Sequence, residues 1–118
     1  MVTKNGDIPF NPPLMMQQKE ALALAKKYKE LLQEAKIPVT ALIVFGSVAR
    51  NDMHDQSDID IAVVGTSFRG DRLEEMNDIR KLRLSLGYQL QPIWFYPEHL
   101  EDRYSTLAQE IKKDGIAV

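Results

Sequence analysis

Cysteine is absent from this chain of 118 residues. Disulfide bridges, zinc sites built on thiolates and thiol nucleophiles are therefore excluded, and an intracellular setting fits the sequence. No apolar run approaches the length of a membrane-spanning helix, and the N-terminal residues MVTKNGDIPF lack the apolar core of a signal peptide. We therefore expect a cytoplasmic protein that does not associate with a membrane.

A strong excess of either charge is also missing. The 15 Lys and Arg residues face 17 Asp and Glu residues, which gives a net charge of -2 and a pI near 5.7. A basic surface is not indicated, so we expect no direct binding of nucleic acid. The length suits one hydrophobic core. We expect residues 1–12 to be a flexible N-terminal segment and residues 13–118 to form one domain.

Hydrophobic periodicity predicts helices that alternate with strands. The predicted helices cover residues 13–36, 47–50, 71–86, 97–100 and 106–114, and the predicted strands cover 39–45, 58–64 and 88–96, followed by an apolar tail at 116–118. The buried stripe of the third helix comprises Leu73, Met76, Ile79, Leu82 and Leu86. Pro92 cannot donate to a ladder, so the last strand lies at a sheet edge or is bulged. This order predicts an α/β sandwich with a short mixed sheet of three to five strands and helices packed on it.

The first chemical signal is the turn Gly46-Ser47, which follows the apolar strand 39–45. A helix that begins here offers unpaired N–H groups and the positive end of its dipole. Gly46 has no side chain, so a phosphate group can approach the backbone, and Ser47 adds a hydroxyl donor. Such turns are common connectors, and the turn alone therefore indicates little.

The second signal is the pair Asp58 and Asp60, at the start of a strand that is otherwise apolar. In a strand these side chains point to the same face, with Cβ atoms about 6.5–7 Å apart. Both carboxylates can then reach one Mg²⁺, or a pair of metal ions about 3.5–4 Å apart. A hard cation would offset the cost of placing the carboxylates near an apolar interior. The alternative is that both acids lie at a solvated strand end or pair with Arg50 and Arg80.

Together, the residues GSVARNDMHDQSDIDIAVV resemble the signature of the nucleotidyltransferase superfamily related to DNA polymerase β, and the small size resembles its minimal nucleotidyltransferases. The resemblance implies that Gly46 and Ser47 hold the phosphates of a nucleoside triphosphate and that Asp58 and Asp60 bind Mg²⁺ and are catalytic. Arg50 matches a family arginine, which either contacts phosphate or braces the acids. Proteins of this kind often act beside a HEPN-domain toxin, so the resemblance also implies a HEPN-like partner. The sequence leaves homo-oligomer formation open.

Two positions depart from the family pattern. The superfamily usually supplies a third carboxylate from the next strand, and Gln91 occupies that position here. Glutamine is a poor base, and loss of a general base typically costs about 10²–10⁴-fold in rate. The missing acid could come from Glu98 or from the acceptor protein. Asn51 replaces the family glycine after the arginine, which is a minor change because asparagine tolerates left-handed backbone geometry.

Two functions remain open at this point. The first is an enzyme that transfers a nucleoside monophosphate, AMP from ATP, to a hydroxyl group on a partner protein in an antitoxin-like role. The second is a catalytically weak or inactive protein of the same fold that acts as an antitoxin by binding its partner. Gln91 favours the second function, and the retention of Gly46, Ser47, Asp58 and Asp60 favours the first.

Overall fold

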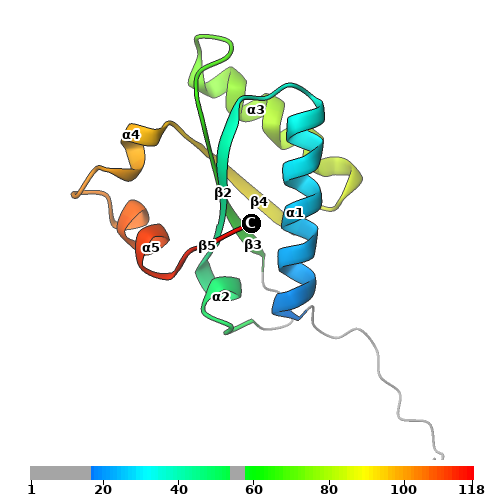
Figure 1. Ribbon diagram of the computed structural model, residues 1–118, viewed down its shortest axis with the longest axis vertical. Helices are drawn as coiled ribbons and strands as arrows, with labels where there is room; N and C mark the ends of the chain where they lie inside the picture. Colours follow the sequence, from blue (N-terminus) through cyan, green and yellow to red (C-terminus); the bar gives the residue numbers. More distant parts are fainter. Residues whose placement is uncertain (1–16, 54–57) are drawn as a thin grey trace, which may run out of the picture.

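The computed structural model describes residues 17–53 and 58–118, so the predicted flexible segment 1–12, the predicted helical residues 13–16 and the loop residues 54–57 lie outside the described part. The described chain forms a four-stranded mixed sheet with helices on both faces, which confirms the predicted α/β architecture (Figure 1). The elements are α1 (Gln18–Glu34), β2 (Val39–Phe45), α2 (Gly46–Ala49), β3 (Ile59–Gly65), α3 (Arg72–Leu82), η1 (Arg83–Ser85), β4 (Leu90–Phe95), α4 (Pro97–Leu100), α5 (Thr106–Asp114) and β5 (Ile116–Ala117).

The strands follow the order β4-β3-β2-β5 across the sheet. β2 runs antiparallel to both β3 and β5, and β3 runs parallel to β4. β4 is an edge strand, as Pro92 required, because a proline can occupy an edge without breaking a ladder on both sides. Residues 116–117 of the apolar tail predicted at 116–118 form the opposite edge strand, β5.

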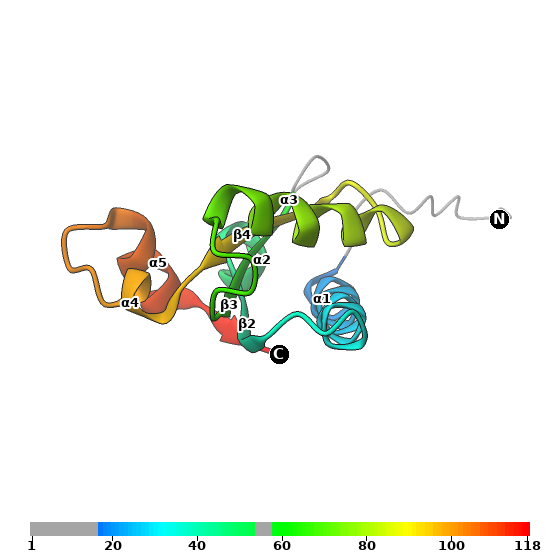
Figure 2. The same cartoon turned by 90° about the horizontal axis from the view of Figure 1, so that it is seen from above.

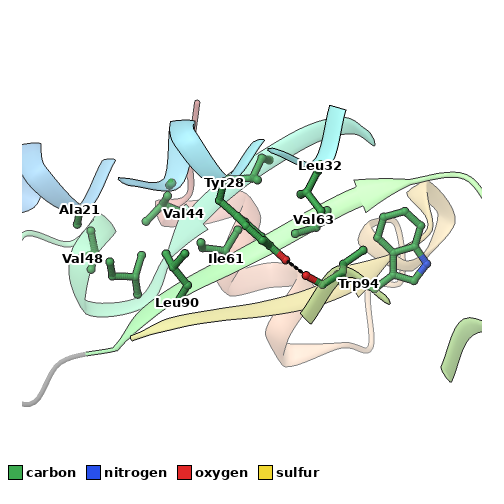
Figure 3. Packing of buried hydrophobic residues seen from close by; sticks show 13 residues of the cluster. Ala21, Tyr28, Leu32, Val44, Val48, Ile61, Val63, Leu90 and Trp94 are labelled. Carbon is green, nitrogen blue, oxygen red and sulfur yellow. Dashed lines mark hydrogen bonds between the residues drawn. The ribbon is translucent and has the colours of Figure 1, made fainter. Parts of the chain in front are cut away.

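One face of the sheet packs against α1 and α3. The buried side chains of α1 repeat at helical spacing, and Tyr28 among them donates a hydrogen bond from its hydroxyl to the Ile79 carbonyl of α3, at 2.5 Å (Figure 3). From the sheet, Val44, Ile61 and Trp94 enter the same core. The alternation of a strand therefore turns the odd-numbered residues of β3 toward α1 and α3.

The other face of the sheet packs against α5 (Figure 2). Ile111 of α5 contacts a second apolar cluster formed by Phe45, Ala62, Val64 and Phe95. The even-numbered residues of β3 therefore point toward α5. Because side chains alternate along a strand, Asp60 lies on the same face as Ala62 and Val64.

Several predicted boundaries were wrong by a few residues. α1 ends at Glu34 rather than at residue 36, because Lys36 adopts a left-handed backbone with a φ of 67° and turns the chain toward β2. The third helix was predicted to reach residue 86, but it ends at Leu82 and continues as a turn of 3₁₀ helix, η1. β3 begins at Ile59 rather than at Asp58.

The predicted buried stripe of the third helix was wrong at Leu73, whose side chain is 71% exposed. Ile79 is fully buried as predicted, and the buried residue in the first turns of α3 is Glu75. Asp71 caps the helix by accepting hydrogen bonds from the backbone N–H groups of Leu73 and Glu74. The apolar face of α3 is therefore rotated away from Leu73, and a carboxylate takes its place in the interior.

The buried Glu75 carboxylate joins α3 to β4 and to the loop between β3 and α3. Its Oε1 accepts hydrogen bonds from Trp94 Nε1 at 3.0 Å and from the Tyr96 hydroxyl at 2.5 Å. Its Oε2 accepts from Ser67 Oγ and from the backbone N–H groups of Phe68, Arg69 and Gly70, at 2.7 to 3.2 Å. A buried charge with this many donors is satisfied without a cationic partner.

These hydrogen bonds determine how Glu75 titrates. Burial would raise the pKa of the Glu75 carboxyl, but the donors from Tyr96, Arg69, Ser67 and Trp94 outweigh burial and hold the pKa well below its ordinary value of 4.5. A carboxyl whose pKa is lowered by folding stabilises the folded state fully above its unfolded pKa. That stability is lost as the pH falls below 4.5 toward the folded pKa.

We predict that Glu75→Gln lowers the free energy of unfolding by about 2–4 kcal/mol at neutral pH. The amide nitrogen of glutamine is a hydrogen-bond donor and would face donor groups of the protein that now bond to a carboxylate oxygen. Urea denaturation between pH 7 and pH 3 measures this, and the loss should shrink as the pH falls. Glu74→Gln is the control, since Glu74 is an exposed neighbour paired with Arg69, and it should change stability by less than about 1 kcal/mol. Equal effects of the two variants would contradict the role given to Glu75.

No helix within residues 17–53 and 58–118 combines the length and the apolar character that crossing a membrane requires.

Candidate active site

The candidate site lies where β2 ends and β3 begins. Phe45 closes β2, Gly46 starts α2, and the antiparallel register pairs Phe45 with Asp60 of β3. The predicted turn Gly46-Ser47 and the predicted acid Asp60 are therefore neighbours, although the sequence separates them by more than ten residues.

Gly46 approaches the Asp60 carboxylate very closely. Its φ is +74°, a backbone conformation that side chains rarely adopt, and a Cβ atom at this position would lie 2.3 Å from Asp60 Oδ2. Two independent constraints thus require glycine at position 46. The close approach places the Gly46 backbone directly beside a carboxylate, so a phosphate bound at this turn would share the site with Asp60.

The two predicted acids occupy different settings. Asp58 immediately precedes β3 and is exposed, whereas Asp60 is the second residue of β3 and is partly buried. Burial raises the pKa of the Asp60 carboxyl, the charges of Asp58 and Glu110 raise it further, and the charge of Arg50 lowers it. The folded state therefore binds this proton more tightly than the unfolded state, and ionised Asp60 lowers stability as the pH rises through its folded pKa.

Arg50 links the site to α5. It is the C-terminal capping residue of α2, and its Nη1 lies 3.4 Å from Glu110 Oε2. Arg80, the other predicted partner of the acids, lies on α3, where its charge acts on Tyr28 instead. The next residue, Asn51, adopts a left-handed backbone with a φ of 56°, so asparagine fills the position of the family glycine as expected.

Glu110 was not predicted as a site residue. It precedes the buried Ile111 of α5, and its charge acts on Asp60. The amphipathic pattern of α5 could have placed Ile111 inward. No pattern in the sequence, however, indicates which strand α5 covers, and that packing brings Glu110 to the acids.

Gln91 is the residue predicted at the position of the family's third carboxylate. In the parallel register of β3 and β4 it pairs with Asp60, and the alternation of each strand places both residues on the face of the sheet that packs against α5. Its side-chain amide is turned toward the segment just before β4, because Nε2 donates to the Tyr88 carbonyl at 2.8 Å. The suggestion that Glu98 supplies the acid was wrong. β3 and β4 run parallel, so Glu98 follows the far end of β4, whereas Asp60 lies near the start of β3.

The side chains of Asp58 and Asp60 fit a hard cation such as Mg²⁺. Both are carboxylates, which supply the oxygen ligands that this ion prefers. Asp60 also carries an electrostatic cost from burial and from neighbouring negative charge, which a cation would relieve. Within the described residues, no group of three or more His, Cys, Asp or Glu side chains is arranged to hold a metal ion.

We predict that Gly46→Ala pushes the Asp60 carboxyl out of its partly buried position, so that its raised pKa falls toward the ordinary value. Titration of the Asp60 side-chain carboxyl carbon by NMR measures this. Gly70→Ala is the matched control, because Gly70 has a similar φ of +77° but open space at the Cβ position. Both variants should lose about 1–2 kcal/mol of stability from the backbone strain. An Asp60 pKa that is the same in both variants would contradict this geometry.

Comparison with solved structures finds relatives of the same fold. A protein from Sulfolobus solfataricus assigned as a nucleotidyltransferase superposes with a TM-score of 0.63 at 23% identity, over 85% of this chain and 80% of that chain. A toxin–antitoxin solved with AMP-PNP matches with a TM-score of 0.52 at 25% identity, over 79% and 70% of the two chains. The toxin–antitoxin MntA-HepT matches with a TM-score of 0.51 at 20% identity, over 81% and 69%.

A search of curated protein sequences found no match. The family described as "Polymerase beta, Nucleotidyltransferase" matches residues 26–118, which is most of the chain and includes Gly46, Asp58 and Asp60. The chain therefore belongs to the polymerase β nucleotidyltransferase family.

Proposed function

We propose that this protein transfers a nucleoside monophosphate, AMP from ATP, to a hydroxyl group of a partner protein, in a reaction that depends on Mg²⁺. The observation that carries the proposal is the close approach of Gly46 to the Asp60 carboxylate. It joins a turn that a phosphate can approach to an acid that a cation would stabilise. Family membership makes nucleotidyl transfer the chemistry that such a site serves.

Each predicted residue has a role in this proposal. Gly46 and Ser47 hold the β- and γ-phosphates, and Arg50, the capping residue at the C-terminus of α2, binds the same phosphate groups. Asp58 and Asp60 hold Mg²⁺, which neutralises the triphosphate and stabilises the charge that develops as pyrophosphate leaves. Burial and the neighbouring carboxylates make Asp60 costly to ionise alone, so the cation and the nucleotide are expected to bind together.

We propose an antitoxin-like role with a HEPN-like toxin as the partner. The similarity to two toxin–antitoxin structures supports this, and one of them was solved with AMP-PNP. The acceptor hydroxyl would then lie on the toxin, so that transfer modifies the partner covalently.

A second candidate is a protein of this fold that inhibits its partner by binding alone. Gln91 favours it, because a neutral side chain stands beside Asp60 and its amide is already engaged by the Tyr88 carbonyl. The two candidates differ in one outcome, since only the first leaves a covalent nucleotide on the partner.

The test is incubation of the protein with Mg²⁺, ATP labelled at the α-phosphate and the protein encoded beside it in the genome. We predict label on the partner with the unaltered protein and none with Asp58→Ala combined with Asp60→Ala. The double variant should fold at least as stably, because it removes a carboxylate whose pKa is raised by burial and by neighbouring negative charge.

Glu98→Ala combined with Glu101→Ala is the matched control, since it also removes two acids but from the opposite end of the sheet. It should label the partner normally. Tight complex formation without label would favour the binding role over the enzyme, and labelling that survives the loss of both Asp58 and Asp60 would show that the site lies elsewhere.

A further inference from the structure

The proposed transfer needs a proton acceptor that the predicted site lacks. The attacking hydroxyl must lose its proton as its oxygen bonds to the α-phosphorus. Asp58 and Asp60 are committed to the cation in this proposal. Gln91 cannot accept the proton effectively, and Glu98 lies beyond the far end of β4.

Among the described residues, Glu110 of α5 is a carboxylate that can fill this gap. α5 packs through Ile111 onto the sheet face that carries Asp60, and Glu110 is the adjoining residue. Its Oε2 lies 3.4 Å from Arg50 Nη1, at the end of α2, whose first residue is Gly46. Glu110 therefore reaches the site from the helix that covers it, rather than from the strand that usually supplies the third acid.

The geometry of the Arg50–Glu110 ion pair would allow Arg50 to leave Glu110 and bind a phosphate group instead. The two side chains are 43% and 40% exposed, and they meet through one nitrogen and one oxygen at a long separation. Exposed ion pairs of this kind add little stability, and guanidinium groups bind phosphate strongly. A triphosphate at Gly46 and Ser47 would thus attract Arg50 and leave the Glu110 carboxylate available to accept a hydrogen bond from the acceptor hydroxyl.

We propose that Glu110 is the catalytic base of the transfer, an inference that rests on the proposed function. The acceptor oxygen forms a bond to the α-phosphorus, and the bond from that phosphorus to the oxygen of the β-phosphate breaks. The hydroxyl proton passes to the Glu110 carboxylate, and pyrophosphate leaves with the electron pair of the broken bond. Arg50 binds phosphate and so couples nucleotide binding to release of the base.

The experiment measures two quantities for Glu110→Gln: the rate of label transfer from ATP to the partner and the affinity for Mg²⁺ with AMP-PNP by calorimetry. We predict that the rate falls by about 10²–10⁴-fold while the dissociation constant does not rise. The affinity is preserved because a neutral amide holds Arg50 less strongly than a carboxylate does and does not repel phosphate. Glu110→Asp should retain part of the rate, since it keeps a carboxylate on a shorter side chain.

Two controls separate a base from a residue that only orients Arg50. Glu101→Gln removes an exposed carboxylate at the end of α4. Glu101 pairs at 3.2 Å with Lys112 of α5, the helix that carries Glu110, and the variant should leave both quantities unchanged. In an Arg50→Ala background, Glu110→Gln should still cut the rate by a similar factor, because loss of a base does not depend on the arginine.

The outcomes identify which proposal fails. Transfer by the unaltered protein together with an undiminished rate in Glu110→Gln would overturn the role of Glu110 and leave the proposed function intact. An effect of Glu110→Gln that disappears in the Arg50→Ala background, or that consists of weaker nucleotide binding, would also overturn it. Absence of transfer by the unaltered protein would overturn the proposed function and the base together.

Discussion

The candidate site depends on the close approach of Gly46 to the carboxylate of Asp60. The antiparallel register of β2 and β3 sets this approach by pairing Phe45 with Asp60. A side chain at position 46 would meet Asp60 Oδ2 at 2.3 Å and would also need a left-handed backbone. Glycine therefore allows the turn after β2 to lie directly against the Asp60 carboxylate, and the proposed phosphate and cation sites both depend on this contact.

The electrostatics of the site follow from its position at the margin of the sheet. β3 is buried along most of its length, and Asp60 stands at its start, on the face that α5 covers through Ile111. Partial burial and the charges of Asp58 and Glu110 disfavour ionisation of Asp60, and Arg50 opposes them. Such an arrangement is costly in the protein alone and would be relieved by a bound cation. This cost favours binding over a purely structural role for the acids.

The sequence predicted the parts of the structure that depend on local pattern. β2 begins and ends at the predicted residues because its apolar run is bounded by Pro38 and Gly46. The family resemblance predicted that the turn Gly46-Ser47 and the acids Asp58 and Asp60 belong to one site. The residues that the sequence did not predict, Glu75 and Glu110, take their places through contacts between distant segments. Glu75 is buried in place of Leu73 because donors from β4 and from the loop before α3 converge on its carboxylate. Glu110 reaches the site only through the packing of α5, which periodicity alone does not orient.

A crystal structure with Mg²⁺ and AMP-PNP tests the central claim most directly. The triphosphate should lie on Gly46 and Ser47, with one well-ordered metal ion held by Asp58 and Asp60. Gln91 should keep its hydrogen bond to the Tyr88 carbonyl. A nucleotide bound elsewhere would contradict the site, and two fully occupied metal ions with Gln91 as a ligand would contradict its description as a site with two metal-binding acids.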